Sequence, residues 1–155
     1  MHEGGTTDRV PAQGAQTWEG PLDTAIMFVD LVDSSVFASV LGLKEYSDYV
    51  ESFHNVVRVQ CDHFFEHCLK GKYEKGRDYE YYVMGDQLVF FMHTAKPSND
   101  VYILTTLGIT LKAAWVASPF NRERVERRSA AAEIAIGINF GTVWAKRLKS
   151  GFETH

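Results

Sequence analysis

One short apolar run with an acid at its end constrains the fold of this chain most. The segment from Ala25 to Val29 reads AIMFV, contains only apolar residues and is followed directly by Asp30. A continuous apolar run of this length is typical of a central strand that is covered on both faces. The Asp30 carboxylate is therefore expected at the carboxyl end of that strand.

The rest of the chain alternates between helical and strand-like patterns. Asp33 begins a sequence that can cap a helix. Apolar residues then recur at spacings of three and four, which is typical of an amphipathic helix. Further on, two aromatic and β-branched stretches flank a tight turn that ends in Asp86, which indicates a hairpin. Pro119 is expected to end a helix, and the arginine-rich segment 121–128 to form a solvated loop or a frayed helix. The predicted elements are a helix over 36–41, a helix over 43–69, strands over 79–83 and 87–92, a helix over 101–118 and a strand over 132–140.

This order of elements predicts an α+β fold, in which a ferredoxin-like antiparallel sheet carries its helices on one face. A length of 155 residues suits a single domain. Residues 1–22 are rich in glycine and proline and are expected to form a flexible leader, with the domain over 23–155.

Charge and hydropathy argue against nucleic acids and membranes as partners of this chain. The net charge of −4 argues against a nucleic-acid binder, which usually carries a basic face. No apolar run approaches the roughly 18 residues of a membrane helix, and the opening segment lacks the pattern of a signal peptide. We therefore expect a cytoplasmic protein that does not span a membrane.

The two acids Asp30 and Asp86 would lie side by side if their strands are neighbours in the sheet. Carboxylates at close range repel each other, and a divalent cation between them removes the repulsion. Magnesium suits such a site because it accepts one or two carboxylates and fills its other positions with water and phosphate oxygens. The alternative, in which each Asp is an ordinary turn or capping residue, is equally compatible with composition.

The segment that follows Asp30 favours the metal interpretation. Residues 31–35 place successive backbone N–H groups and the hydroxyls of Ser34 and Ser35 at a predicted helix start, which is a common arrangement for binding an anion. A strand-end carboxylate, a phosphate cradle and a second acid on a hairpin together describe a site for a triphosphate and its metal ions.

Three segments in this order resemble motifs of the class III adenylate and guanylate cyclases. FVDLVDSS at 28–35 is similar to the family's F-x-D-[LIV]-x-G-S-T pattern, YVMGD at 82–86 to its second-acid hairpin, and IGINFGTV at 136–143 to its later I-G-I-N-x-G-x-V strand. The resemblance spans about residues 24 to 145. It implies that the chain is a nucleotidyl cyclase catalytic domain.

The resemblance implies roles for individual residues. Asp30 and Asp86 match the catalytic aspartates that bind two divalent metal ions, Mn²⁺ or Mg²⁺, and Leu31 matches a position whose backbone carbonyl also meets a metal. The family acts as a homodimer with active sites at the interface. It converts a nucleoside triphosphate to a cyclic nucleotide by attack of the ribose 3′-hydroxyl on the α-phosphate, with release of pyrophosphate.

The turn of Val32, Ser34 and Ser35 matches the phosphate-contacting turn of the family. Asp33 departs from the pattern because the family commonly has Gly there. An extra carboxylate close to phosphates would hinder their binding unless it faces away or caps the helix.

Tyr82 occupies the position that helps to read the base, where adenylate cyclases commonly have Lys and guanylate cyclases Glu. A phenol carries neither charge, and its bulk favours a smaller ring. The chain thus resembles the bacterial Pycsar pyrimidine cyclases, which make cyclic UMP or cyclic CMP in antiphage defence for a separate effector. Glu153 falls near the family's second base-reading position. Tyr82 as a packing residue and Glu153 as an exposed loop acid are the alternatives.

The family's Asn-x-x-x-Arg segment would follow Glu153 by about a dozen residues, and the chain ends at His155, so we expect the C-terminal part of the domain to be missing. A chain that needs a second, different chain to complete its site is an alternative. A diguanylate cyclase is disfavoured, because its Gly-Gly-Asp-Glu-Phe signature is replaced by MGDQL at 84–88. An adenylate or guanylate cyclase, and an inactive nucleotide-binding or dimerisation module, remain as alternatives.

Overall fold

The computed structural model describes residues 19–94, 96–148 and 151–154 and divides the chain into two compact units. The larger unit runs from Asp23 to Thr142. The smaller one combines the part of the chain up to Leu22 with the part from Val143 onward. The expected leader over 1–22 lies mostly outside the described residues, although the first strand already begins at Glu19.

The predicted elements occur in the predicted order, and the structure adds a π-helical turn, a helix that begins at Pro119 and a short strand at the end. The elements are β1 (Glu19–Leu31), α1 (Ser34–Val40), α2 (Leu43–His63), the π-helical turn η1 (Phe64–Cys68), β2 (Tyr79–Met84), β3 (Gln87–Met92), α3 (Pro97–Val116), α4 (Pro119–Glu126), β4 (Ile134–Leu148) and β5 (Gly151–Thr154). The strands are ordered β2-β3-β1-β4-β5, and β3 pairs antiparallel with both β1 and β2. This confirms the predicted α+β class with an antiparallel sheet.

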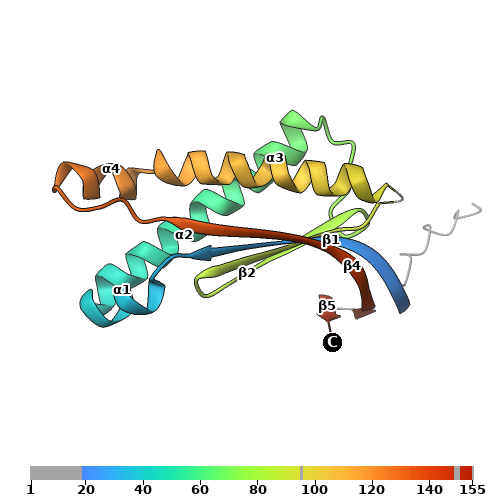
Figure 1. The fold of residues 1–155 in the computed structure, drawn as a ribbon, viewed down its shortest axis with the longest axis horizontal. Helices are drawn as coiled ribbons and strands as arrows, with labels where there is room; N and C mark the ends of the chain where they lie inside the picture. Colours follow the sequence, from blue (N-terminus) through green and yellow to red (C-terminus); the bar gives the residue numbers. More distant parts are fainter. Residues whose placement is uncertain (1–18, 95, 149–150, 155) are drawn as a thin grey trace, which may run out of the picture. The chain divides into compact units, whose positions relative to one another are not determined.

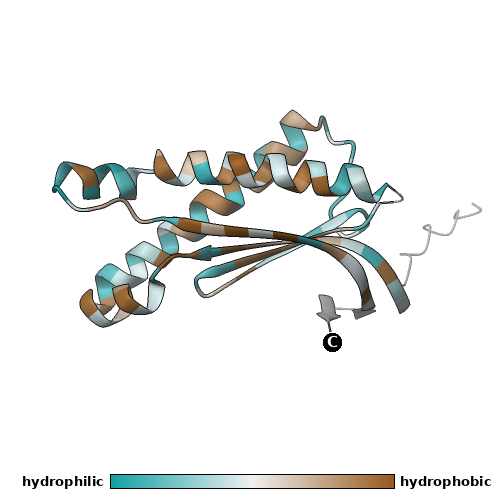
Figure 2. Cartoon of the chain, in the orientation of Figure 1, coloured by the Kyte–Doolittle hydropathy of each residue, from teal (hydrophilic) through white to brown (hydrophobic). Residues whose placement is uncertain are grey.

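In the larger unit, α2 and α3 pack against one face of the sheet and enclose the core (Figure 1). Both helices alternate hydrophobic and hydrophilic bands along their length (Figure 2). On β1, the alternate residues Ala25, Met27, Val29 and Leu31 are buried beneath the helices. The amphipathic helices and the β1 stripe thus account for the hydrophobic core.

The prediction that β1 is covered on both faces is wrong in the larger unit. Phe28 points away from the helix-facing residues and is 49% exposed. A continuous apolar run predicts two-sided burial, but here the helices that form the core lie on the opposite face from Phe28. The apolar run therefore leaves a large hydrophobic side chain on the open face of the sheet.

The predicted long helix over 43–69 ends in a different kind of turn. α2 is regular to His63, and η1 then forms a π-helical turn in which Leu69 N–H donates to Phe64 O at 3.0 Å. A π-turn inserts one residue into the helical phase. As a result Phe64 and Phe65 are both buried, whereas Cys68, expected on the apolar face, is exposed.

The segment expected as a solvated loop or frayed helix over 121–128 belongs to a well-formed helix, α4. Pro119 does end α3, but it also occupies the first turn of α4, where its missing N–H costs nothing. Ser118 caps the helix by accepting from Asn121 N–H at 3.2 Å. The buried Asn121 amide also donates to Trp115 O and Ala132 O, at 2.9 and 3.0 Å.

In the smaller unit, the end of β4 and β5 form an antiparallel pair from Ala145 with Thr154 to Leu148 with Gly151. Across the described residues, no single helix is long and apolar enough to span a membrane, while the bent pair α3 and α4, at 43°, passes that test by length and composition.

Candidate active site

Asp30 and Asp86 meet where β1 ends and the β2–β3 hairpin turns. Asp30 lies opposite Gln87 in the β1–β3 register. The next residue, Leu31, donates its backbone N–H to Asp86 O at 3.1 Å, which extends the ladder by one step. The structure therefore brings the two acids predicted from the sequence to the same end of the sheet.

The two carboxylates have different surroundings. Ser34, the first residue of α1, donates its hydroxyl to Asp86 Oδ2. Asp30 Oδ1 is buried and has no hydrogen-bond partner among the residues that the structure describes. Burial of an unpartnered carboxylate oxygen is costly, and a bound cation would remove that cost.

These residues fit a cation site that relies on few protein ligands. Within the described ranges there is no group of three or more His, Cys, Asp or Glu side chains that could hold a metal. Two carboxylates are nevertheless enough for Mg²⁺, which completes its shell with water, backbone oxygens and substrate phosphates. The orphaned Asp30 oxygen is the feature that favours a cation here.

The turn between β1 and α1 has a left-handed backbone conformation at Asp33, the position where the cyclase motif has Gly. Asp33 adopts φ 57° and ψ 25°, in the left-handed region where Gly is preferred and where Asp is tolerated better than most residues. Its side chain is exposed and makes no capping hydrogen bond within the described part of the chain. The backbone at Asp33 is thus one that a glycine would also adopt.

The predicted phosphate-binding residues are partly engaged in this structure. Val32 N–H donates to Glu133 O at 3.0 Å, next to β4. The Ser34 hydroxyl is bound to Asp86, while Ser35 is exposed in the first turn of α1. A phosphate that used the Val32 amide would have to displace the bond to Glu133.

Tyr82 lies on the same face of the sheet as Asp30. It pairs with Val89, which in turn pairs with Phe28, and cross-strand partners share a face. Its ring packs edge-on against Phe91, with centroids 6.3 Å apart. The side chain is half-buried and lines a pocket of about 410 Å³.

Glu153 belongs to the smaller unit. Its backbone pairs with Lys146 in the β4–β5 ladder. Its side chain lies outside what the structure describes, so its predicted role in base reading stays a prediction.

His54 is a residue near this site that sequence reasoning did not identify. It projects from α2, and its Nε2–H donates to Gly85 O at 2.5 Å, one residue before Asp86. The helical pattern does not single out His54, because it is a partly buried residue next to the apolar stripe, like many others on an amphipathic helix. Only the docking of α2 against the hairpin gives it a contact.

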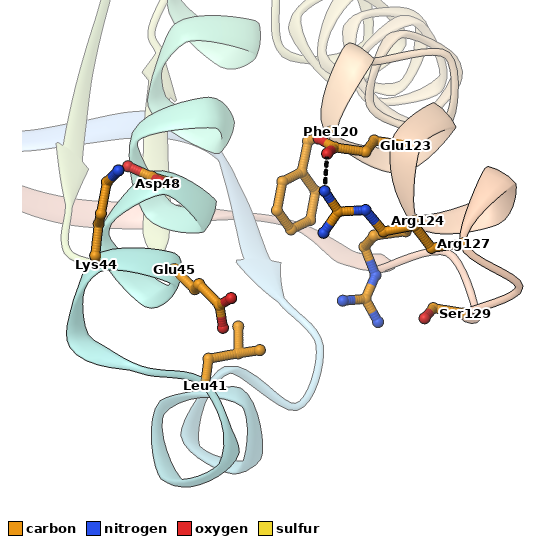
Figure 3. A pocket seen from close by; sticks show the side chains of 9 residues that line it. All are labelled: Leu41, Lys44, Glu45, Asp48, Phe120, Glu123, Arg124, Arg127 and Ser129. Atoms are coloured by element: carbon orange, nitrogen blue, oxygen red, sulfur yellow. Dashed lines mark hydrogen bonds and ion pairs between the residues drawn. The ribbon is translucent and has the colours of Figure 1, made fainter.

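A larger pocket lies elsewhere in the same unit, between the α1–α2 junction and α4 (Figure 3). Its volume is about 530 Å³, and its walls carry charges of both signs. None of the predicted site residues line it. The lining residues are Leu41, Lys44, Glu45, Asp48, Phe120, Glu123, Arg124, Arg127 and Ser129.

Solved structures with a similar fold are nucleotide cyclases and a related protein. The guanylyl cyclase Cya2 matches with a TM-score of 0.65 at 16% identity, over 89% of this chain and 66% of that one. A bacterial light-regulated adenylyl cyclase matches with a TM-score of 0.62 at 12% identity, over 90% of this chain and 36% of that one. A class III adenylyl cyclase-like ATP-binding protein from Pseudomonas aeruginosa matches with a TM-score of 0.52 at 17% identity, over 83% of this chain and 26% of that one.

The chain therefore shares the fold of these cyclase structures. The chain spans at most 66% of the length of these structures. No family model and no curated protein matches the sequence.

Proposed function

We propose that this chain is the catalytic portion of a nucleotide cyclase that converts a nucleoside triphosphate to a 3′,5′-cyclic monophosphate and pyrophosphate. The observation that carries the proposal is the meeting of Asp30 and Asp86 at one end of a cyclase-type sheet, with Asp30 Oδ1 buried and unpartnered among the described residues. A structural role for Asp30 would leave that oxygen unexplained.

In this proposal Asp30, Asp86 and the Leu31 carbonyl hold two divalent cations, Mn²⁺ or Mg²⁺. When bound, such cations activate the attacking ribose hydroxyl and neutralise the charge that grows on the leaving pyrophosphate. The chain's own residues position the triphosphate: Ser34 and Ser35 lie at the start of α1 and contact its phosphates. Ser34 exchanges its bond to Asp86 for one to the substrate.

The substrate that we favour is a pyrimidine nucleoside triphosphate, UTP before CTP. Tyr82 offers neither the positive charge of a lysine nor the carboxylate of a glutamate for reading a purine. Its half-buried ring, packed on Phe91, also occupies space on the face that carries Asp30. Glu153 is the proposed second contact to the base, and the cyclic product would act on a separate effector in antiphage defence inside the cytoplasm.

We further propose a homodimer that forms through the open face of the sheet. Phe28, on that face near the carboxyl end of β1, is 49% exposed. A large apolar side chain on a sheet face is a common feature of interfaces. The Asp30 carboxylate shares this face, so that a second copy would close the site.

The test is incubation of the full-length protein with Mn²⁺ and each of the four ribonucleoside triphosphates, with products identified by mass spectrometry. We expect a cyclic pyrimidine nucleotide, and its loss in Asp30→Ala and Asp86→Ala with circular dichroism unchanged. Exclusive conversion of ATP or GTP would refute the role of Tyr82. Full activity in either Ala variant would refute the metal assignment.

A second candidate is nucleotide binding without turnover. The observation in its favour is the similar fold of the ATP-binding protein from Pseudomonas aeruginosa. Retention of triphosphate with millimolar Mn²⁺, measured by calorimetry, together with no cyclic product from any of the four nucleotides would favour it.

A further inference from the structure

The hairpin turn that carries Asp86 lies at the surface. Met84 and Gly85 are exposed, and Gly85 adopts φ 57°, a left-handed conformation that glycine takes without steric cost. Surface turns are on average more mobile than the strands that they connect. Something must hold this turn if Asp86 is to stay in one place.

Three hydrogen bonds hold this turn from three different elements. Leu31, at the end of β1, donates to Asp86 O, and Ser34, at the start of α1, donates to the Asp86 carboxylate. The third comes from α2, where His54 Nε2–H donates to Gly85 O at 2.5 Å. Of the two side chains, only His54 binds the turn's backbone and leaves the carboxylate free for a ligand.

His54 is well placed to hold the turn because its helix is anchored in the core. The preceding residue, Phe53, is fully buried, and its ring lies 6.1 Å from the imidazole. Tyr49 and Val57, one turn away on either side, are also buried in the core. The imidazole thus links α2 to the hairpin, 31 positions away in the sequence.

We propose that His54 is a positioning residue, which fixes Asp86 for metal binding by holding the Gly85 carbonyl. The contact is a property of the fold alone, whereas its purpose rests on the proposed function. When a substrate or metal draws Ser34 or the Asp86 carboxylate into other contacts, the bond from His54 keeps the backbone of the turn in place.

The first test needs no metal. The Leu31 amide donates to Asp86 O, so its hydrogen exchange reports on opening of the turn. In His54→Ala we expect Leu31 to exchange about 2- to 10-fold faster, in line with the loss of one net hydrogen bond. The core amides of Leu88 and Phe90 should keep their protection, and His54→Gln should restore slow exchange through its side-chain N–H.

The matched control is His63→Ala, the same change on the same helix at an exposed residue whose ring packs on His67. It should leave Leu31 exchange unchanged. If His54→Ala does not fold, His54→Leu keeps the contact with Phe53 without the donor and should show the same increase. Unchanged Leu31 exchange in the folded Ala or Leu variant would overturn the proposal.

The second test links the turn to the metal. Manganese binding to the full-length protein, followed by electron paramagnetic resonance, should weaken several-fold in His54→Ala and recover in His54→Gln. Faster Leu31 exchange with unchanged manganese affinity would overturn the positioning role. If the wild-type protein binds no manganese, the proposed function fails, while Leu31 exchange still decides whether His54 holds the turn.

Discussion

At the residue scale, the proposed function of Asp30 conflicts with the stability of the fold. A carboxylate with a buried oxygen and no hydrogen-bond partner among the described residues destabilises the metal-free fold. Asp86 lies at the same end of the sheet, and its carboxylate accepts a hydrogen bond from Ser34. The sequence identified both acids, but it could not show that only one of them is left unsatisfied.

This difference predicts the behaviour of Asp30→Asn. Loss of the charge should leave the metal-free protein as stable as the wild type or more stable by about 1 kcal/mol. Manganese at about 100 times its dissociation constant should stabilise the wild type by about 2.7 kcal/mol and the variant not at all. Urea unfolding with and without manganese measures both effects. Equal stabilisation of the two proteins would show that Asp30 is not a ligand.

At the scale of elements, the approach of α3 to the sheet depends on Gly108. A Cβ atom at this position would lie 3.3 Å from Ile136 Cγ2 on β4 and 3.5 Å from Met27 Sδ on β1. Those distances leave little room for any side chain. Glycine therefore lets α3 pack closely on the strands that position Asp30.

Gly108→Val should destabilise the fold by about 1–3 kcal/mol, because its methyl groups overfill this contact. The control is Gly137→Val on β4, where nothing lies within 4 Å of an added Cβ. Chemical denaturation of both variants makes the comparison. A Gly108 variant as stable as the Gly137 variant would show that α3 shifts freely on the sheet.

At the scale of the whole molecule, a buried histidine contributes to the pH dependence of stability. His93 follows β3 and donates to Arg77 O at 2.5 Å. Its burial, partly opposed by Asp78, lowers its pKa from 6.5 to about 4. The neighbouring Asp78 has a pKa lowered below 3.8, chiefly by its hydrogen bond to Arg77, so its own effect lies at lower pH.

The free energy of unfolding should therefore fall as the pH drops from 6.5 towards 4. Over that range the unfolded chain protonates at residue 93 while the folded protein does not, so acid favours unfolding. Below about pH 4 both states carry the proton, and this contribution levels off. In His93→Gln the dependence between pH 6.5 and 4 should flatten, as measured by urea unfolding across that range. An unchanged slope would contradict the assignment.

The proposed dimer also concerns the molecule as a whole, because it would form through the open face of the sheet. Phe28→Asp places a charge on the open face of the sheet and should weaken self-association by more than about tenfold. The control is Val59→Asp on α2, an exposed residue of the opposite layer, which should leave association unchanged. Sedimentation velocity of the full-length variants distinguishes them. Equal association in both would place the interface elsewhere.

The sequence by itself determined the fold class and the order of elements, because apolar periodicity and turn residues act locally. It also identified Asp30 and Asp86, since an acid after an apolar run and an acid in a hairpin turn are local features. The cyclase resemblance then assigned them a role. Those predictions needed no knowledge of how the elements pack.

Only the tertiary structure decided how the acids are held. The unpartnered oxygen of Asp30, the bond from Ser34 and the contact of His54 with Gly85 all join residues from different elements, and the hydrogen bond from His54 spans 31 positions. The exposure of Phe28 and the buried amide of Asn121 in α4 likewise depend on which face the helices cover. Such contacts depend on packing between distant segments, which no local pattern records.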